Sequence, residues 1–391
     1  MALAVTDDIP YGNVCDVNIR QRRDVCEVEF AASAHGGAER LWFCMRLQQE
    51  GGKTSASRLR LVLKHVTSML GCHKPELIRP VARTGGGDWA RMGPGSVETT
   101  EDGRIRIAWE LEAPVSFMDI AFCYPYGRPD LETLISDTDC YWRAETIGVS
   151  QCDRPIMRLS NDSGQEGGER PGLYFIARQH SAETPGSWVL DGVLRQLADC
   201  EDAPLVWAVP LSNIDGVEQG DYGKDNFPWD VNRAWGEVPM RHETVAIQRD
   251  LAAWTKRCRP MLGLDFHAPC GTEYDGAYTF IPKQTNFPEL HEQTRQWTER
   301  IRVALGEYAA PKFTRTADYA SRWQLPDLTT GSWYTPNFTR YCASHLHMPV
   351  FTLETPYALI GDILMGREQY REIGERIARE LVELCRERCV Q

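Results

Sequence analysis

The sequence predicts an α/β protein, in which an N-terminal antiparallel β-sandwich precedes a mixed, mostly parallel sheet flanked by helices. Residues 1–115 carry short runs in which apolar and polar side chains alternate, a period of two that is typical of strands with one buried face. From about residue 116, continuous apolar runs alternate with helical patterns, as in α/β domains. Because 391 residues are many for one core, we predict two domains, 1–115 and 116–391.

The expected elements follow in order along the chain. Alternation predicts sandwich strands over residues 25–30, 40–46, 58–64 and 104–109. Continuous apolar runs predict buried strands over 172–177, 205–210, 261–266 and 350–353. Helical periodicity predicts helices over 188–197, 242–256, 289–305 and 367–386. Ligands of such sheets bind beyond the carboxyl ends of the strands, so the polar residues found there are the candidate site.

Composition narrows the class of protein. A net charge of −12 disfavours binding to nucleic acid and to anionic membranes. The longest apolar runs are too short for a membrane span, and the N-terminus does not resemble a secretory signal. The 13 cysteines are scattered and form no Cys-x-x-Cys pair, which favours reduced thiols in a cytoplasmic protein. The sequence does not indicate an oligomeric state.

Two histidines and a glutamate form a candidate metal site. His180 and Glu183 lie in the turn that follows the apolar run 172–177, and His267 follows the run 261–266. A catalytic zinc takes imidazole and carboxylate ligands, with one position left for water. A single histidine at a strand end is more often a hydrogen-bonded core residue. The set of three predicts one zinc ion per chain.

Two further clusters fall at strand ends or in the loops beyond them. Asn232 and Arg233 offer an amide beside a guanidinium fork, which suits bidentate capture of a carboxylate. Glu354 closes the run 350–353 and could take a proton from an attacking water and pass it to a leaving amine. The alternatives are a surface ion pair between Asp230 and Arg233, which would be worth little, and a turn cap by Glu354.

The order and spacing of these clusters resemble the zinc carboxypeptidase family, and within it the cytosolic carboxypeptidase branch. The resemblance extends over about residues 115–365. The matching stretches are Phe122–Leu131, Ala177–Glu183 with Ser187 and Trp188, Asn213–Val217, Asp230–Arg233, Asp265–His267 and Thr352–Glu354. An N-terminal β-sandwich is also expected from this branch.

The resemblance implies a role for each matched residue. His180, Glu183 and His267 would be zinc ligands, and Asp230 would orient the first zinc histidine. Glu354 would be the general base and then the general acid. Asn232 and Arg233 would hold the terminal carboxylate of the substrate.

The chain also departs from the family. In the family, an arginine that stabilises the oxyanion commonly follows the loop that corresponds to Asp215–Val217. This chain has no arginine there, and Lys224 could stand in as a point charge. The tyrosine that caps substrate has only a weak counterpart, Tyr334. Arg340 could favour an acidic side chain in the pocket, although an exposed arginine is the simpler interpretation.

The function expected from these residues is hydrolysis of the C-terminal peptide bond of a peptide or protein in the cytoplasm. One alternative is a zinc amidase or deacylase that acts on acylated amino acids or cell-wall peptides. The other is a binding module that keeps the fold without catalysis. The complete ligand set together with Glu354 favours an enzyme.

Overall fold

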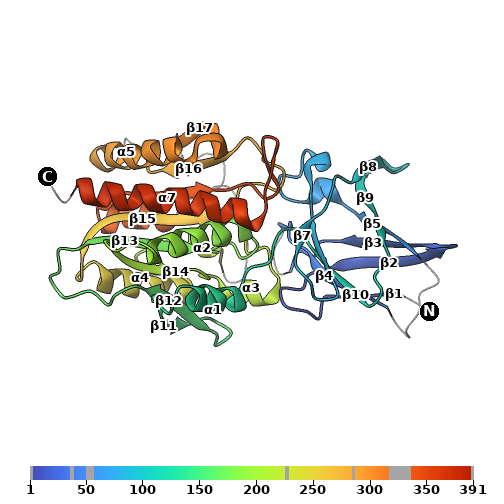
Figure 1. Ribbon diagram of the computed structural model, residues 1–391, viewed down its shortest axis with the longest axis horizontal. Coiled ribbons are helices and arrows are strands. Elements are labelled where there is room, and N and C mark those ends of the chain that lie inside the picture. Colours follow the sequence, from blue (N-terminus) through green and yellow to red (C-terminus); the bar gives the residue numbers. More distant parts are fainter. Residues whose placement is uncertain are drawn as a thin grey trace.

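The computed structural model describes residues 3–35, 39–49, 57–224, 229–283, 287–316 and 336–388. These residues form two β-rich parts that lie end to end, with the chain passing from one to the other once (Figure 1). The N-terminal part contains only strands and short 3-10 turns, whereas the larger part contains strands and helices. The expected α/β class is confirmed.

The N-terminal part is a sandwich of two five-stranded sheets, in the orders β1-β4-β10-β6-β7 and β2-β3-β5-β9-β8. Side chains such as Phe30, Phe43, Leu61 and Ile120 fill the core between them and are fully buried. The strands are β1 (Leu3–Thr6), β2 (Cys15–Arg22), β3 (Val25–Ala31), β4 (Cys44–Gln49), β5 (Arg58–Leu63), β6 (Val81–Thr84), β7 (Ala90–Arg91), β8 (Ser96–Thr99), β9 (Ile105–Glu112) and β10 (Phe117–Ala121).

The sandwich differs from the expectation in three details. One neighbouring pair, β3 and β5, runs parallel, so the sheets are not wholly antiparallel. The predicted strand over 40–46 begins only at Cys44, and Leu41, Trp42 and Phe43 are buried without belonging to a strand. Strand β10 pairs with β4 and β6, so the N-terminal sheet extends past residue 115. The division of the chain into two folding domains stays a prediction.

The larger part is built on an eight-stranded mixed sheet with the order β11-β12-β14-β13-β15-β18-β16-β17. Its centre is parallel, since β13 runs parallel to β14 and β15, and β15 runs parallel to β18. The strands are β11 (Arg143–Val149), β12 (Pro155–Ser160), β13 (Pro171–Ala177), β14 (Leu205–Val209), β15 (Arg259–His267), β16 (Ala277–Ile281), β17 (Ala309–Thr316) and β18 (Val350–Glu354). All four predicted buried strands are confirmed.

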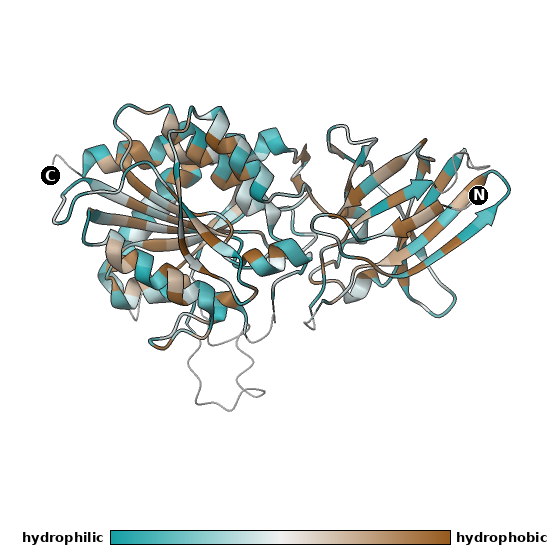
Figure 2. Ribbon diagram, turned by 90° about the horizontal axis from the view of Figure 1, so that it is seen from below, coloured by the Kyte–Doolittle hydropathy of each residue, from teal (hydrophilic) through white to brown (hydrophobic). Residues whose placement is uncertain are grey.

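Helices cover both faces of this sheet, whose central strands are the most apolar part of the domain (Figure 2). Helix α2 packs against α7, and α7 packs against α5, so these three form one layer. The helices are α1 (Arg128–Asp137), α2 (Thr184–Ala198), α3 (Ile214–Gln219), α4 (His242–Trp254), α5 (Pro288–Leu305), α6 (Phe338–His345) and α7 (Arg367–Glu387). No helix among the described residues is both long and apolar enough to span a bilayer.

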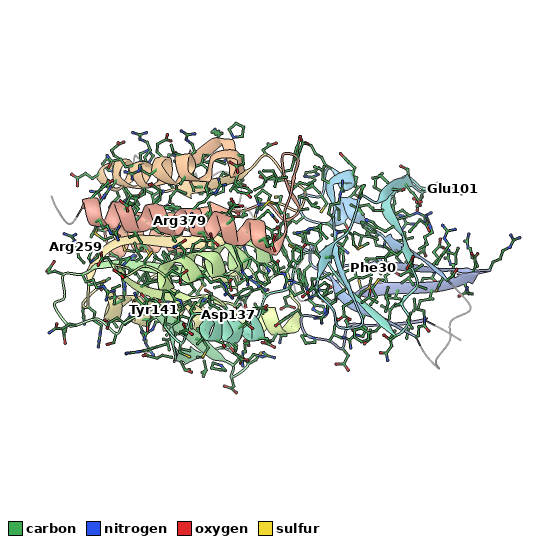
Figure 3. All side chains as sticks on the ribbon, in the orientation of Figure 1. Phe30, Glu101, Asp137, Tyr141, Arg259 and Arg379 are labelled. Atoms are coloured by element: carbon green, nitrogen blue, oxygen red, sulfur yellow. The ribbon has the colours of Figure 1, made fainter. Side chains whose placement is uncertain are left out.

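The carboxyl ends of the central strands point toward the N-terminal sandwich. Arg259, which begins β15, lies at the end of the larger part that is farthest from the sandwich (Figure 3). The opposite end of β15, which carries His267, therefore faces the junction. Arg91 of the sandwich is inserted there and donates to the carbonyls of Tyr357 (2.8 Å) and Met365 (2.9 Å), in the segment that follows Glu354. The junction and the candidate site are thus built from neighbouring segments.

Candidate functional site

The first two metal-ligand candidates are placed by a sharp turn after β13. The strand ends at Ala177, and Arg178 turns the chain with a positive φ of 63°. Its buried guanidinium holds the turn by donating to the carbonyls of Ser181 (2.6 Å) and Tyr126 (2.9 Å). This backbone conformation is strained for any residue other than glycine. Strained residues of this kind are common at functional sites.

The start of α2 brings Glu183 against the end of β15. Glu183 precedes the first residue of the helix. A Cβ atom at Gly186 would lie 2.7 Å from the carbonyl oxygen of Phe266, so only glycine allows the helix to approach β15 this closely. The approach places Glu183 within reach of His267.

His180, Glu183 and His267 meet in one buried cluster. The carboxylate of Glu183 lies between the histidines, with Oε1 2.8 Å from His180 Nδ1 and Oε2 2.6 Å from His267 Nδ1. One ligand atom from each residue lies within 4.8 Å of the others, and all three side chains are buried. The structure thus brings together the three predicted ligands, from two segments more than 80 residues apart.

The surroundings of the histidines fit a metal ion at this point. His267 Nε2 lies 2.8 Å from Asp265 Oδ2, and His180 Nε2 lies 3.4 Å from Asp230 Oδ1. Asp265 can accept the Nε2 proton of His267 and leave its Nδ1 lone pair directed toward the centre, as for metal-bound histidines, while Asp230 faces Nε2 of His180 at ion-pair distance. Two imidazoles and one carboxylate are also the donor set of a catalytic zinc. The residues can therefore hold a metal ion.

Charge pairing dominates the protonation of this cluster without metal. Burial opposes the charged forms, but Asp265 and Glu183 hold the pKa of His267 well above its usual value. The two histidines in turn hold the pKa of Glu183 well below its usual value, against the effect of burial. An ionised carboxylate is the form that binds a cation.

Glu354 lies beside this cluster at the end of β18. Its backbone pairs with that of His267 across the two parallel strands, and the next residue, Thr355, donates its N–H to the His267 carbonyl (3.1 Å). Oε2 of Glu354 is buried without a hydrogen-bond partner among the described residues. Burial raises the pKa of this carboxyl to about 7. A carboxyl with a raised pKa beside a metal site suits general acid–base work.

Lys224 also reaches the cluster. Its Nζ lies 3.9 Å from Glu183 Oε1. Burial lowers the pKa of Lys224, but the negative charges of Glu183 and Glu39 raise it by more. The pKa of Lys224 therefore lies above its usual value. The preceding residue, Gly223, has a φ of 96°, and a Cβ there would lie 2.2 Å from the Ser181 nitrogen. Position 223 therefore excludes a side chain, and the cation is carried by the next residue.

The Asp-Val-Asn-Arg motif forms a short 3-10 turn over Val231–Arg233. Asp230 caps the turn by accepting the N–H of Asn232 (2.7 Å), and its Oδ1 lies 3.4 Å from His180 Nε2. Asn232 Nδ2 lies 3.5 Å from His267 Nε2. Arg233 is half-buried and donates to the carbonyl of Asn232 (2.8 Å). Asn232 thus lies beside His267, one of the predicted metal ligands, and Arg233 follows it in the same turn.

Two predicted substrate contacts stay predictions. Tyr334 lies outside the described residues. Arg340 lies in the first turn of α6, where its N–H donates to Asn337 Oδ1 (3.0 Å).

Two buried polar residues of the site, Asp265 and Gln179, were assigned no role from the sequence. Asp265 accepts from His267 and also from Gln179 Nε2 (2.6 Å). The contact between Asp265 and His267 could have been predicted, because residues two apart on a strand point to the same face of the sheet. Gln179 is fully buried and bonds to two segments, residues 232–235 and the end of β15, and its position before His180 carried no such signal.

Comparison with curated sequences finds cytosolic carboxypeptidases. Cytosolic carboxypeptidase 6 of Homo sapiens is 24% identical over 245 residues, which are 57% of this chain and 46% of that protein. Cytosolic carboxypeptidase 2 of Xenopus tropicalis is 33% identical over 218 residues, which are 49% of this chain and 22% of that protein. The chain therefore spans less than half the length of these relatives. No model of a protein family matches.

Comparison with solved structures finds the same architecture over the whole chain. A metallo-carboxypeptidase from Burkholderia cenocepacia superposes with a TM-score of 0.74 at 17% identity, covering 100% of both chains. A metallo-carboxypeptidase from Pseudomonas aeruginosa, solved with (2-guanidinoethylmercapto)succinic acid, has a TM-score of 0.76 at 18% identity and covers 98% of this chain and 99% of its own. At these identities the likeness establishes the fold.

Proposed function

This chain is a relative of the cytosolic carboxypeptidases with the metallo-carboxypeptidase fold, and we propose that it is a zinc-dependent carboxypeptidase of the cytoplasm. The observation that supports the proposal most is the meeting of Glu354 with the cluster of His180, Glu183 and His267 at one sheet edge. A structural ion-pair cluster would not need an unpartnered carboxylate beside it.

The residues divide the chemistry of peptide hydrolysis among them. His180, Glu183 and His267 would hold a zinc ion, which would supply Lewis-acid chemistry for the scissile carbonyl and the attacking water. Glu354 takes a proton from the attacking water and then donates it to the leaving amine. Lys224 offers a positive charge to the oxyanion, although without the bidentate fork of an arginine.

Asn232 and Arg233 make the reaction specific for the end of a chain. A guanidinium and an amide beside the metal ligands can form charge-assisted hydrogen bonds to a free α-carboxylate. An internal peptide bond offers no such group. The enzyme is therefore an exopeptidase, and its substrate is the C-terminus of a peptide or protein.

The test is hydrolysis of three substrate classes by the zinc-loaded protein. C-terminal peptides should lose one residue at a time, and a chelator should stop the reaction. Faster cleavage of acylated amino acids or cell-wall peptides would favour the amidase alternative. A zinc-loaded, folded protein that cleaves none of the three classes but binds peptides would favour the binding module.

Arg233→Met is expected to weaken recognition of the free carboxylate. Charge-assisted hydrogen bonds are worth about 1.5–3 kcal/mol, so kcat/KM for a peptide acid should fall by about 10- to 100-fold, mainly through KM. Activity on the matching C-terminal amide should change little. Steady-state kinetics on both peptides measure the difference. A preference for the acid that survives in Arg233→Met would remove this residue from carboxylate binding.

Lys224→Met is expected to act on the chemical step. If the lysine stabilises the oxyanion, its loss should lower kcat by about 10²–10³ while KM stays nearly constant. The acid and amide peptides should be affected equally, in contrast to Arg233→Met. An unchanged kcat would show that Lys224 neutralises Glu183 and takes no part in catalysis.

A further inference from the structure

The buried amide of Gln179 connects the metal site to the carboxylate-binding pair. Its Oε1 accepts from the indole N–H of Trp235 (2.6 Å). Its Nε2 donates to Asp265 Oδ2 (2.6 Å) and to Asn232 Oδ1 (3.1 Å). Gln179 and Trp235 are both fully buried, and Trp235 packs against Phe338, with ring centroids 5.1 Å apart.

The chemistry of its neighbours determines which way this amide faces. An indole nitrogen can only donate, so the atom of Gln179 that faces Trp235 must be the carbonyl oxygen. A carboxylate oxygen accepts the hydrogen bond, so the atom that faces Asp265 Oδ2 at 2.6 Å is the nitrogen. Two independent neighbours thus select the same orientation of Gln179.

The orientation of the Gln179 amide in turn determines the orientation of the Asn232 amide. The Nε2 group of Gln179 can only donate, so the Asn232 atom facing it must be Oδ1. The Nδ2 group of Asn232 is then directed away from Gln179. It lies 3.5 Å from His267 Nε2, which is long for a hydrogen bond, whereas Asp265 Oδ2 lies only 2.8 Å from that nitrogen. The Asn232 N–H groups are therefore weakly engaged within the protein and can be offered to a substrate.

We infer that Gln179 is a specificity-determining positioning residue, which holds the Asn232 amide with its N–H groups toward the substrate and thereby selects a free carboxylate. The inference rests on the proposed function and adds the device that orients its carboxylate-binding amide. An Asn232 turned by 180° would present a carbonyl oxygen, which repels a carboxylate but accepts a hydrogen bond from a C-terminal amide.

Gln179→Met tests this role, because methionine has a similar length and shape but neither donates to Asn232 nor accepts strongly from Trp235. KM for a C-terminal peptide acid should rise about 10-fold, and kcat should change much less. KM for the matching peptide amide should stay constant, so the acid preference falls. Zinc content, measured by mass spectrometry, should remain at the wild-type value. A merely structural role would lower activity on both peptides alike.

Trp235→Phe provides a second variant that keeps a large ring in the same place. It removes one of the two groups that orient Gln179, so the acid preference should fall in the same direction by about 3-fold. The matched control is Trp254→Phe, since Trp254 is fully buried and its indole N–H has no hydrogen-bond partner among the described residues. That control should keep the wild-type preference.

The outcomes separate this inference from the proposed function. An acid preference that is lost in Arg233→Met but intact in both Gln179→Met and Trp235→Phe would overturn the role of Gln179 alone. A wild-type enzyme without any acid preference would overturn both. An equal loss of activity on acid and amide in Gln179→Met would reassign the residue to support of the metal site.

Discussion

Replacing His180 and Glu183 together by alanine is expected to abolish zinc binding while the protein stays folded. The two residues supply two of the three ligand atoms, and His267 alone does not form a catalytic site. Wild-type protein should contain about one zinc per chain, and the double variant close to none, as measured by mass spectrometry of the dialysed proteins. Peptide hydrolysis should fall to the background.

Thermal unfolding gives a second readout that does not depend on activity. A ligand that binds only the folded state stabilises it by about 4 kcal/mol at 1,000 times its Kd, so added zinc should raise the Tm of metal-free wild-type protein. The double variant should show no such rise. His345→Ala removes an exposed histidine of α6 and should behave as wild type. Zinc that persists at one per chain in the folded double variant would overturn the ligand assignment.

The long helices could be predicted from sequence because their apolar period is strong. Helix α7 was expected over 367–386 and covers Arg367–Glu387, and α5 begins one residue earlier than expected, at Pro288. Helix α2 was expected from residue 188 but begins four residues earlier, at Thr184, so that Pro185 and Gly186 lie in its first turn. Proline is favoured in the first turn of a helix, and Gly186 is required there by the approach to Phe266. The start of α2 was thus predicted wrongly at the point where the helix approaches β15 to form the site.

The meeting of His180, Glu183 and His267 could be predicted because parallel strands bring their carboxyl ends to one edge. The polar network around them could not. Gln179 bonds to Asn232 and Asp265, which lie 53 and 86 residues away, so their contact depends on the register of β13 against β15. No local spacing encodes such a contact. Asp265 could have been found from its position two residues before His267, whereas Gln179 could only be found from the fold.

Glu354→Gln is expected to separate the acid–base step from metal binding. Glutamine keeps the shape of the side chain but cannot take a proton from water, so kcat should fall by about 10²–10⁴, the usual worth of general acid–base catalysis. KM and zinc content should stay close to wild type, because Glu354 is not one of the three clustered ligand residues. Steady-state kinetics and metal analysis on the same preparation measure both.

The pH profile shows whether Glu354 acts as the base. The carboxylate must be ionised to accept a proton, so wild-type kcat/KM should fall as the pH drops through its pKa. Burial raises that pKa to about 7 in the metal-free protein, and a bound cation lowers it, so the acid limb should lie below pH 7. The Glu354→Gln variant should lose this limb along with most of its rate. Turnover near the wild-type value, with the acid limb still present, would show that another group activates the water.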